Sequence, residues 1–349
     1  MELLRDACTL HEDRWAAWYN CSRALSLLLQ EREESKSASE DELKALEEEK
    51  LNALRKALLL KPRHAGCLYR LGMSLRERGD HREATQALED FLALDAVGSA
   101  KRQAGARHWL AVLRGETTAT APAEYVAGLF DGYAERFDKH LVETLEYRTP
   151  QLLAEELEQV KAVIAAESSD ADQPVLFQRC ADLGCGTGLM GPLLKDLGVE
   201  HLEGVDLSSK MLQVAREKQR GYDVLLCGDL VEIFDETKSF DLVVAADVFV
   251  YLGDLSSVLH ASAARLARHG VVAFSTEAPP RSGGANEHEG QLAEGTFKLA
   301  ETGRYIHTAS YVRHCAENCG LKLWKRRNVV LRKNGGKPVY GQLHVLRKM

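Results

Sequence analysis

A glycine-rich segment, ADLGCGTGLMG at residues 181–191, holds the residue types best suited to ligand chemistry. An apolar run precedes it and a helical pattern follows it, so it predicts a loop between a strand and a helix. Gly184, Gly186 and Gly188 would let the backbone turn sharply and approach a ligand closely. Gly186, Gly188 and Gly191 also satisfy G-x-G-x-x-G, a spacing that by itself would equally predict a dinucleotide site.

Residues at three strand ends distinguish a dinucleotide from other ligands that contain adenosine. Asp182 stands just before the loop, where a carboxylate would repel a pyrophosphate but attract a cationic amino group. Asp206 ends the next predicted strand, where either ligand could use its carboxylate through the ribose hydroxyls of an adenosine. Asp229 and Leu230 follow the third strand, where they would bind the adenine amino group and pack on the ring. These positions predict a pocket for adenosine joined to an amino acid, which S-adenosylmethionine fits.

The elements that must position these residues follow an alternating order. From Val175 onward, short apolar runs alternate with helical patterns, which predicts a parallel sheet with helices on both faces. The runs at 321–333 and 337–348 flank Asn334, Gly335 and Gly336, a turn signal that predicts an antiparallel hairpin. We therefore expect residues 151–349 to form an α/β domain closed by a C-terminal hairpin.

Residues 1–120 are rich in Ala, Leu, Glu and Arg, which predicts an all-helical domain. Leu68, Gly72 and Ala84 fall at the spacing of a tetratricopeptide repeat, with the turn at Gly79; a generic helical bundle is the alternative. The acidic stretch 31–50 is interpreted as a solvated helix end or a flexible insertion, with an acidic docking segment as the alternative.

Residues 121–150 are predicted to contain a linker and one helix over Tyr125–Leu145. Phe130, Tyr133 and Phe137 share one aromatic-rich face of that helix. Such a stripe is often simple core, but its place just before the α/β domain equally suits a lid over that domain's cleft.

Composition limits the class of protein. The chain has 349 residues, with 45 Lys and Arg against 52 Asp and Glu, and the net charge of −7 argues against a dedicated nucleic-acid binder. No apolar run approaches the roughly 18–20 residues that would cross a membrane. Eight scattered cysteines favour a reducing compartment, so we expect a cytoplasmic protein.

The motifs resemble the class I S-adenosylmethionine-dependent methyltransferases. The resemblance spans roughly 128–349 and rests on the segment 182–188, Asp206, the segment 228–230 and the run 240–251. The segments 126–138 and 303–307 also resemble predicted methyltransferases that carry N-terminal tetratricopeptide repeats. The resemblance implies a Rossmann-like seven-stranded methyltransferase domain, a parallel sheet closed by an antiparallel C-terminal hairpin, preceded by an all-α repeat-like domain.

The resemblance also implies a part of the cofactor for each site residue. The methionine portion would be held by Asp182, Gly184, Cys185, Gly186, Thr187 and Gly188. The ribose would be bound by Asp206, and the adenine by Leu207, Met211, Asp229 and Leu230. Asp247 and Val248 would face the methionine end and the methyl acceptor. Tyr133 and Phe137 would close over the cofactor.

Methyl transfer from a sulfonium mainly requires alignment of the reactants and exclusion of water. A carboxylate acceptor needs no strong base, whereas a neutral hydroxyl or amine must lose a proton. The candidate bases are His307, Tyr305, Glu277 and Tyr251; His307 has a suitable unperturbed pKa of about 6.5, but it could instead only orient or cap the helix that follows it. Arg304 is a candidate for binding an anionic substrate, and no metal site is expected.

We therefore predict an S-adenosylmethionine-dependent methyltransferase with an unidentified acceptor: a small molecule, a protein or a carrier-bound substrate. The helical domain could recruit a protein partner. The alternative is a non-catalytic tetratricopeptide scaffold whose methyltransferase fold only senses a cofactor or is purely structural.

Overall fold

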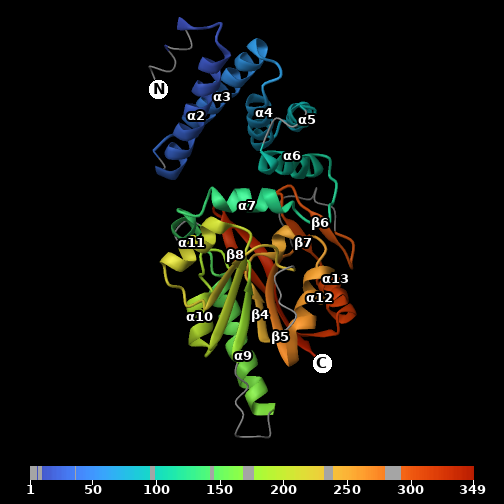
Figure 1. Cartoon of the computed structure of the whole chain (residues 1–349). Coiled ribbons are helices and arrows are strands. Elements are labelled where there is room, and N and C mark those ends of the chain that lie inside the picture. Colours follow the sequence, from blue (N-terminus) through green and yellow to red (C-terminus); the bar gives the residue numbers. More distant parts are fainter. Residues whose placement is uncertain are drawn as a thin grey trace. The chain divides into compact units, whose positions relative to one another are not determined.

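The computed structural model describes residues 6, 10–35, 37–94, 99–141, 145–167, 177–231, 239–279 and 292–349. The chain divides into two compact units, Met1–Arg114 and Gly115–Met349 (Figure 1). Among the described helices, none combines the length and the apolar character needed to span a bilayer.

The first unit is helical throughout its described elements. These are α2 (Trp15–Ser35), α3 (Glu40–Leu60), α4 (Ala65–Arg78), α5 (His81–Leu92) and α6 (Ala100–Leu113). A capping box of Ser39 and Glu42 starts α3, so the acidic stretch 31–50 supplies the end of α2 and the first half of α3.

The α4–α5 hairpin of this unit explains two glycines. A Cβ on Gly72 would lie only 2.7 Å from Leu88 Cδ2, so the small residue lets the two helices pack closely. Gly79 ends α4 with a φ of 92°, a left-handed conformation that glycine adopts readily. The expected helical hairpin is present, while its membership of the tetratricopeptide class stays a prediction.

The second unit is built on one mixed sheet. Its parallel part has the order β3 (Val224–Cys227), β2 (His201–Asp206), β1 (Arg179–Leu183), β4 (Phe240–Ala245) and β5 (Leu266–Glu277). Then β9 (Lys337–Lys348) pairs antiparallel with both β5 and β8 (Leu321–Asn334), as the expected hairpin. Over the described residues the sheet has nine strands instead of the expected seven, because β6 (Phe297–Leu299) and β7 (Tyr305–His307) add a short antiparallel pair.

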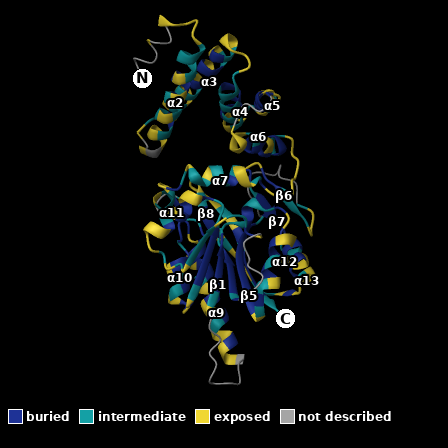
Figure 2. Cartoon of the chain, viewed as in Figure 1, coloured by how far each residue is buried: buried dark blue, intermediate teal, exposed yellow. Residues whose placement is uncertain are grey.

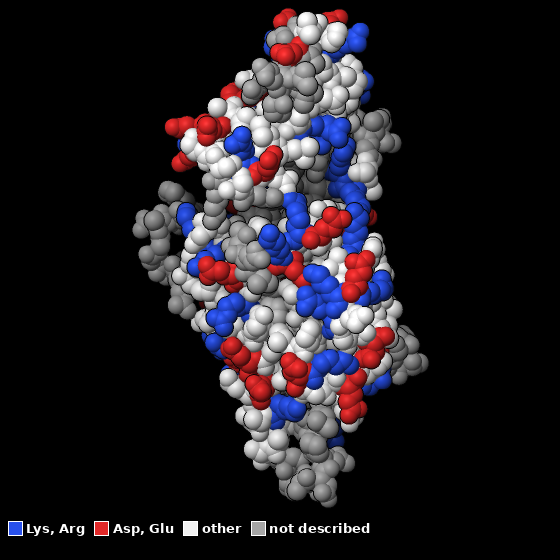
Figure 3. Space-filling model, turned by 90° about the vertical axis from the view of Figure 1, so that its left-hand side faces the viewer, with Lys and Arg blue, Asp and Glu red and all other residues white. Residues whose placement is uncertain are grey.

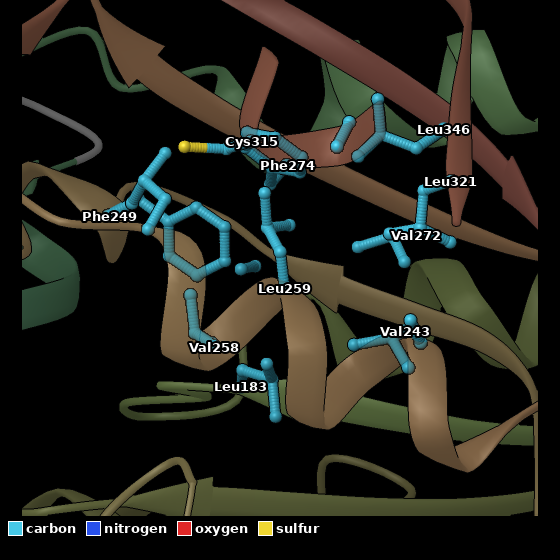
Figure 4. Packing of buried hydrophobic residues seen from close by; sticks show 14 of the residues in the cluster. Leu183, Val243, Phe249, Val258, Leu259, Val272, Phe274, Cys315, Leu321 and Leu346 are labelled. Carbon is cyan, nitrogen blue, oxygen red and sulfur yellow. The ribbon is translucent and has the colours of Figure 1, made fainter. Parts of the chain in front are cut away.

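Helices cover both faces of this sheet, and successive side chains of each strand point to opposite faces. Val243 and Phe274 point to the side of α12 (Ser256–Arg265) and α13 (Ala309–Asn318), the cluster drawn in Figure 4. Val244 and Ala273 point to the side of α9 (Thr149–Glu167) and α10 (Gly191–Asp196). The central strands are accordingly buried on both sides (Figure 2).

Charged side chains of both signs are interspersed over the face drawn in Figure 3.

Some of the ion pairs in the second unit link a helix to a strand of the sheet. Lys325 and Arg327 on β8 reach the buried Glu156 of α9, with N–O distances of 2.6 and 2.7 Å. The basic side chains of this strand therefore help to fix α9 against the sheet.

The single helix predicted over Tyr125–Leu145 is wrong. The structure has α7 (Ala123–Asp131), a run of turns and the short α8 (Phe137–Lys139). Gly128 and Gly132 lie one turn apart and weaken a continuous helix, which explains why α7 ends at Asp131.

Candidate functional site

The glycine loop after β1 forms the centre of the site. Gly184, Gly186 and Gly188 all have positive φ, at 66°, 55° and 83°. A Cβ on Gly184 would clash with the side chain of Val248, so this glycine lets the loop pass close to the end of β4. Among the described residues, a Cβ on Gly186 would meet only the Phe137 ring, at 4.0 Å, so this face of the loop is open to a ligand once that ring moves aside.

Asp206, at the end of β2, is hydrogen-bonded to this loop. Its Oδ2 accepts from the Gly186 amide at 2.9 Å, and its Oδ1 accepts from the Ser208 amide at 2.8 Å. Burial raises the pKa of Asp206 to about 6. A carboxylate accepts about four hydrogen bonds, so both oxygens keep capacity for the hydroxyls of a ribose.

Asp182 lies beneath the loop and is 1% exposed. The Tyr222 hydroxyl donates to its Oδ2 at 2.6 Å. Burial raises the pKa of Asp182 to about 7, against the lowering effect of the Tyr222 hydrogen bond. Sequence reasoning did not find Tyr222, because no motif connects it to Asp182, 40 residues away.

Aromatic side chains from the lid segment gather beside the loop. The rings of Tyr133 and Phe137 lie 5.4 Å apart between centroids, and Phe130 lies 6.0 Å from Phe137. Phe130 also contacts Tyr251, at 5.6 Å. The structure thus brings the predicted residues Tyr133, Phe137 and Tyr251 into one group.

Two acidic residues of the same segment are bonded to the site, and sequence reasoning did not single them out. The Asp131 carboxylate accepts from the Ser208 hydroxyl at 2.8 Å. The Asp138 carboxylate accepts from the Thr187 hydroxyl. The only sequence signal was their place in the motif FDGYAERFD at 130–138.

The predicted adenine-side residues follow the ends of β2 and β3, and one of them lies on the next helix. Asp229 accepts from the Val231 amide at 2.9 Å, and Leu230 is buried in the core. Met211 is fully buried on α11 (Ser209–Glu217), and Leu207 is half-buried. Their contacts with a cofactor stay predictions.

A buried charge cluster occupies the ends of β4 and β5. The Arg332 guanidinium, from β8, donates to both Asp247 and Glu277. Arg304 lies 3.6 Å from Glu277 and is more exposed, at 29% against 5% for Arg332. Asp247 has a φ of 60°, and its amide donates to the Ser275 hydroxyl at 2.8 Å. Sequence reasoning did not find Arg332, because Glu277 and Asp247 lie 55 and 85 residues away from it along the chain.

His307 and Tyr305 are placed elsewhere, on the buried strand β7. The His307 Nε2 bonds with the Gly253 carbonyl at 3.1 Å, and burial lowers its pKa to about 4. The Tyr305 hydroxyl lies 2.5 Å from that of Thr118. These bonds with Gly253 and Thr118 are packing contacts of β7, so the structure does not group the two side chains with the glycine loop.

Comparison with known proteins finds similarity between part of this unit and methyltransferases. Residues 181–274 match the family model of a methyltransferase domain. The malonyl-[acyl-carrier protein] O-methyltransferase of Haemophilus ducreyi is 30% identical over 151 residues, which cover 42% of this chain and 56% of that protein. The ubiquinone biosynthesis O-methyltransferase of Albidiferax ferrireducens is 32% identical over 153 residues, covering 40% of this chain and 60% of that protein.

These alignments span less than two thirds of either relative. Among solved structures, a S-adenosylmethionine-dependent methyltransferase from Mesorhizobium loti matches with a TM-score of 0.41 and 22% identity. That match covers 50% of this chain and 92% of the other.

Proposed function

We propose that the second unit binds S-adenosylmethionine and transfers its methyl group to an oxygen acceptor. The observation that carries the proposal is the hydrogen bond between Asp206 and Gly186, which joins a buried carboxylate to a glycine loop with one open face. The methyltransferase-domain match over 181–274 supports S-adenosylmethionine as the cofactor. The names of both relatives, which are O-methyltransferases, support oxygen as the acceptor atom.

The residues present suit this cofactor chemically. Asp182 offers a buried carboxyl to a cationic amino group, and Asp206 offers acceptor oxygens to ribose hydroxyls. Asp229 and Leu230 would hold the adenine side. The bound sulfonium supplies an already activated methyl group. The chain's own task is then to orient the acceptor and to exclude water, for which Phe137 and Tyr133 are placed beside the loop.

The acceptor is proposed to bind at the ends of β4 and β5. Asp247, Glu277 and Tyr251 lie at this end, and the half-exposed Arg304 offers a cation to an anionic acceptor. A carboxylate on a small molecule or on a carrier-bound acyl group would need no base. A phenol would need one, and Glu277 or Tyr251 is then the candidate.

The first unit is proposed to recruit the acceptor or its carrier. A groove of about 760 Å³ is lined by residues of α2, α3, α4 and α6, among them Lys50, Tyr69, Arg70 and Arg102. This groove mixes apolar and charged groups, which supports a protein partner for this unit.

The direct test is calorimetric titration of the full chain with S-adenosylmethionine and S-adenosylhomocysteine, with NAD(H) as the control ligand. The variant Asp206→Asn keeps one acceptor oxygen for Gly186 but loses the charge that binds the ribose. We expect it to weaken both ligands about tenfold to a hundredfold, since a hydrogen bond to a charged group is worth about 1.5–3 kcal/mol. Asp196→Asn, an exposed acid on α10, is the matched control.

Unchanged affinity in Asp206→Asn, or no binding to the unaltered chain, would overturn the proposal. If binding is found, labelled S-adenosylmethionine is offered with carboxylic acyl thioesters on a carrier protein and with phenols. Binding without label transfer to any acceptor would favour the non-catalytic scaffold instead.

A further inference from the structure

The side chain of Asp138 joins three segments that are far apart in sequence. Its Oδ1 accepts from the hydroxyl of Thr187 in the glycine loop. Its Oδ2 lies 2.6 Å from Lys218 Nζ and 2.8 Å from Arg220 Nη2, just after α11. We call these four residues the Asp138 network.

The network is partly shielded from water, so its charges interact more strongly than those of an open surface pair. The side chain of Asp138 is 16% exposed and that of Arg220 is 26% exposed. Burial raises the pKa of Asp138, but the hydrogen bonds from Lys218 and Thr187 outweigh it and hold the pKa below its usual value. Asp138 is therefore charged at neutral pH.

A second contact holds the other end of the same segment. Asp131, the last residue of α7, accepts from the hydroxyl of Ser208, which also caps α11. The chain between Asp131 and Asp138 is thus fixed at both ends, beside the end of β2 and the glycine loop. Phe137, next to Asp138, lies with its ring edge over the open face of Gly186.

We infer that Asp138 is a positioning residue that holds the segment 131–138 closed over the cofactor site and so limits the rate of cofactor entry and release. The inference rests on the proposed function, because it assigns the open face of Gly186 to the cofactor. A ligand that reaches this face must displace the Phe137 ring. Displacement of that ring pulls on the bonds of Asp138 with Thr187, Lys218 and Arg220.

Surface plasmon resonance with the full chain and S-adenosylhomocysteine tests this inference. Asp138→Asn removes the charge and keeps the shape. We expect its association and dissociation rate constants to rise together, each about tenfold, while Kd changes less than threefold. Lys218→Gln should also raise both rate constants. Asp138→Glu keeps the charge, so its rate constants should lie between those of Asp138→Asn and those of the unaltered chain.

Ionic strength gives a second readout. Raising KCl from about 50 to about 500 mM screens partly exposed ion pairs, so S-adenosylhomocysteine should associate with the unaltered chain and dissociate from it faster. The rate constants of Asp138→Asn should depend less on the salt concentration. Asp196→Asn, which removes an exposed acid elsewhere, is expected to leave rates and salt dependence unchanged.

The outcomes separate this inference from the proposed function. No binding of S-adenosylhomocysteine to the unaltered chain would defeat the proposed function itself. Normal binding with identical rate constants in Asp138→Asn and Asp196→Asn would overturn only the role of Asp138. Slower association together with a lowered Tm in Asp138→Asn would also overturn it, because that pattern marks a purely structural residue.

Discussion

Asp182 is a carboxyl group whose protonation changes near neutral pH. Burial brings its pKa to about 7, and Tyr222 is the hydroxyl that keeps it from rising further. A cationic amino group binds the ionised carboxylate and not the neutral acid. Ligand binding should therefore be coupled to loss of a proton from Asp182.

This coupling predicts a pH dependence for S-adenosylhomocysteine affinity. Below pH 7 the free site is increasingly protonated, so affinity should fall by up to about tenfold per pH unit. Asp206, with a pKa of about 6, adds to the fall at lower pH. Titrations at pH 6.5 in phosphate and in imidazole should differ in heat, because a proton is released on binding.

Two variants check this assignment. Asp182→Asn should remove the buffer-dependent heat near pH 7. Tyr222→Phe loses the bond that lowers the pKa of Asp182, so its affinity curve should move to higher pH. A buffer-dependent heat that persists in Asp182→Asn would assign the proton to another group.

The residues found from sequence share a local signal. Gly184, Gly186 and Asp206 stand at strand ends within recognisable motifs, so their types and spacing predicted one pocket, and the structure bonds Asp206 to the Gly186 amide. Tyr222, Arg332 and Asp138 could not be found this way, because each acts through a partner fixed only by the tertiary fold. His307 shows the converse: its side chain is suited to catalysis, but the fold buries it among packing contacts.

At the scale of elements, the β8–β9 hairpin is anchored to the sheet by Arg332. This buried guanidinium reaches past β9 to the carboxylates of Asp247 and Glu277. Breaking a buried charge cluster by removing one partner leaves the others uncompensated. The hairpin should therefore depend on this side chain as well as on the pairing of β9 with β5.

We expect Arg332→Met to lower the free energy of unfolding by about 3–5 kcal/mol. Arg327→Met, on the same strand, should cost no more than about 1 kcal/mol, because Arg327 is half-exposed and Lys325 still pairs with Glu156. Urea unfolding, followed by hydrogen exchange of β9, measures both. The triple variant Arg332→Met, Asp247→Asn and Glu277→Gln should recover part of the lost free energy of unfolding, because it leaves no buried carboxylate without its cation. Equal losses in Arg332→Met and Arg327→Met would contradict the anchoring role.

Strand and helix patterns predicted the α/β elements well, and the segment 123–141 shows where patterns fail. Its aromatic spacing fits a helix, but the glycines Gly128 and Gly132 weaken it and the bonds of Asp131 and Asp138 fix a broken path. The pair β6 and β7 was also missed, because strands of three residues give too short an alternation to detect.

At the scale of the molecule, buried histidines and buried aspartates have opposite effects on the stability of the second unit in acid. Burial lowers the pKa of His307 to about 4 and that of His344 to about 3. Both are neutral when folded, while in the unfolded chain each takes a proton below about pH 6.5. Each histidine should therefore lower the free energy of unfolding by about 1.4 kcal/mol per pH unit as the pH falls from 6.5 toward its folded pKa.

Asp182 and Asp206 act in the opposite direction, because their raised pKa values let the folded state take protons first, below about pH 7 and 6. Between about pH 6 and 4 these two gains nearly cancel the two histidine losses. As the pH falls from 6 to 4.5, the calorimetric Tm should therefore change little in the unaltered chain, rise in His307→Gln and fall in Asp182→Asn. The same slope in all three would contradict this balance.

The pairing of β5 with β9 has a consequence for synthesis of the chain. Residues 271–277 of β5 receive one of their two neighbours from residues 341–347, which the ribosome makes some seventy positions later. Until then the nascent β5 presents an unpaired apolar edge, the kind of edge that joins other chains. Translation speed and chaperone supply over this interval should set the yield of folded protein, and substitutions that slow closure of β9 should reduce that yield before they change any equilibrium property.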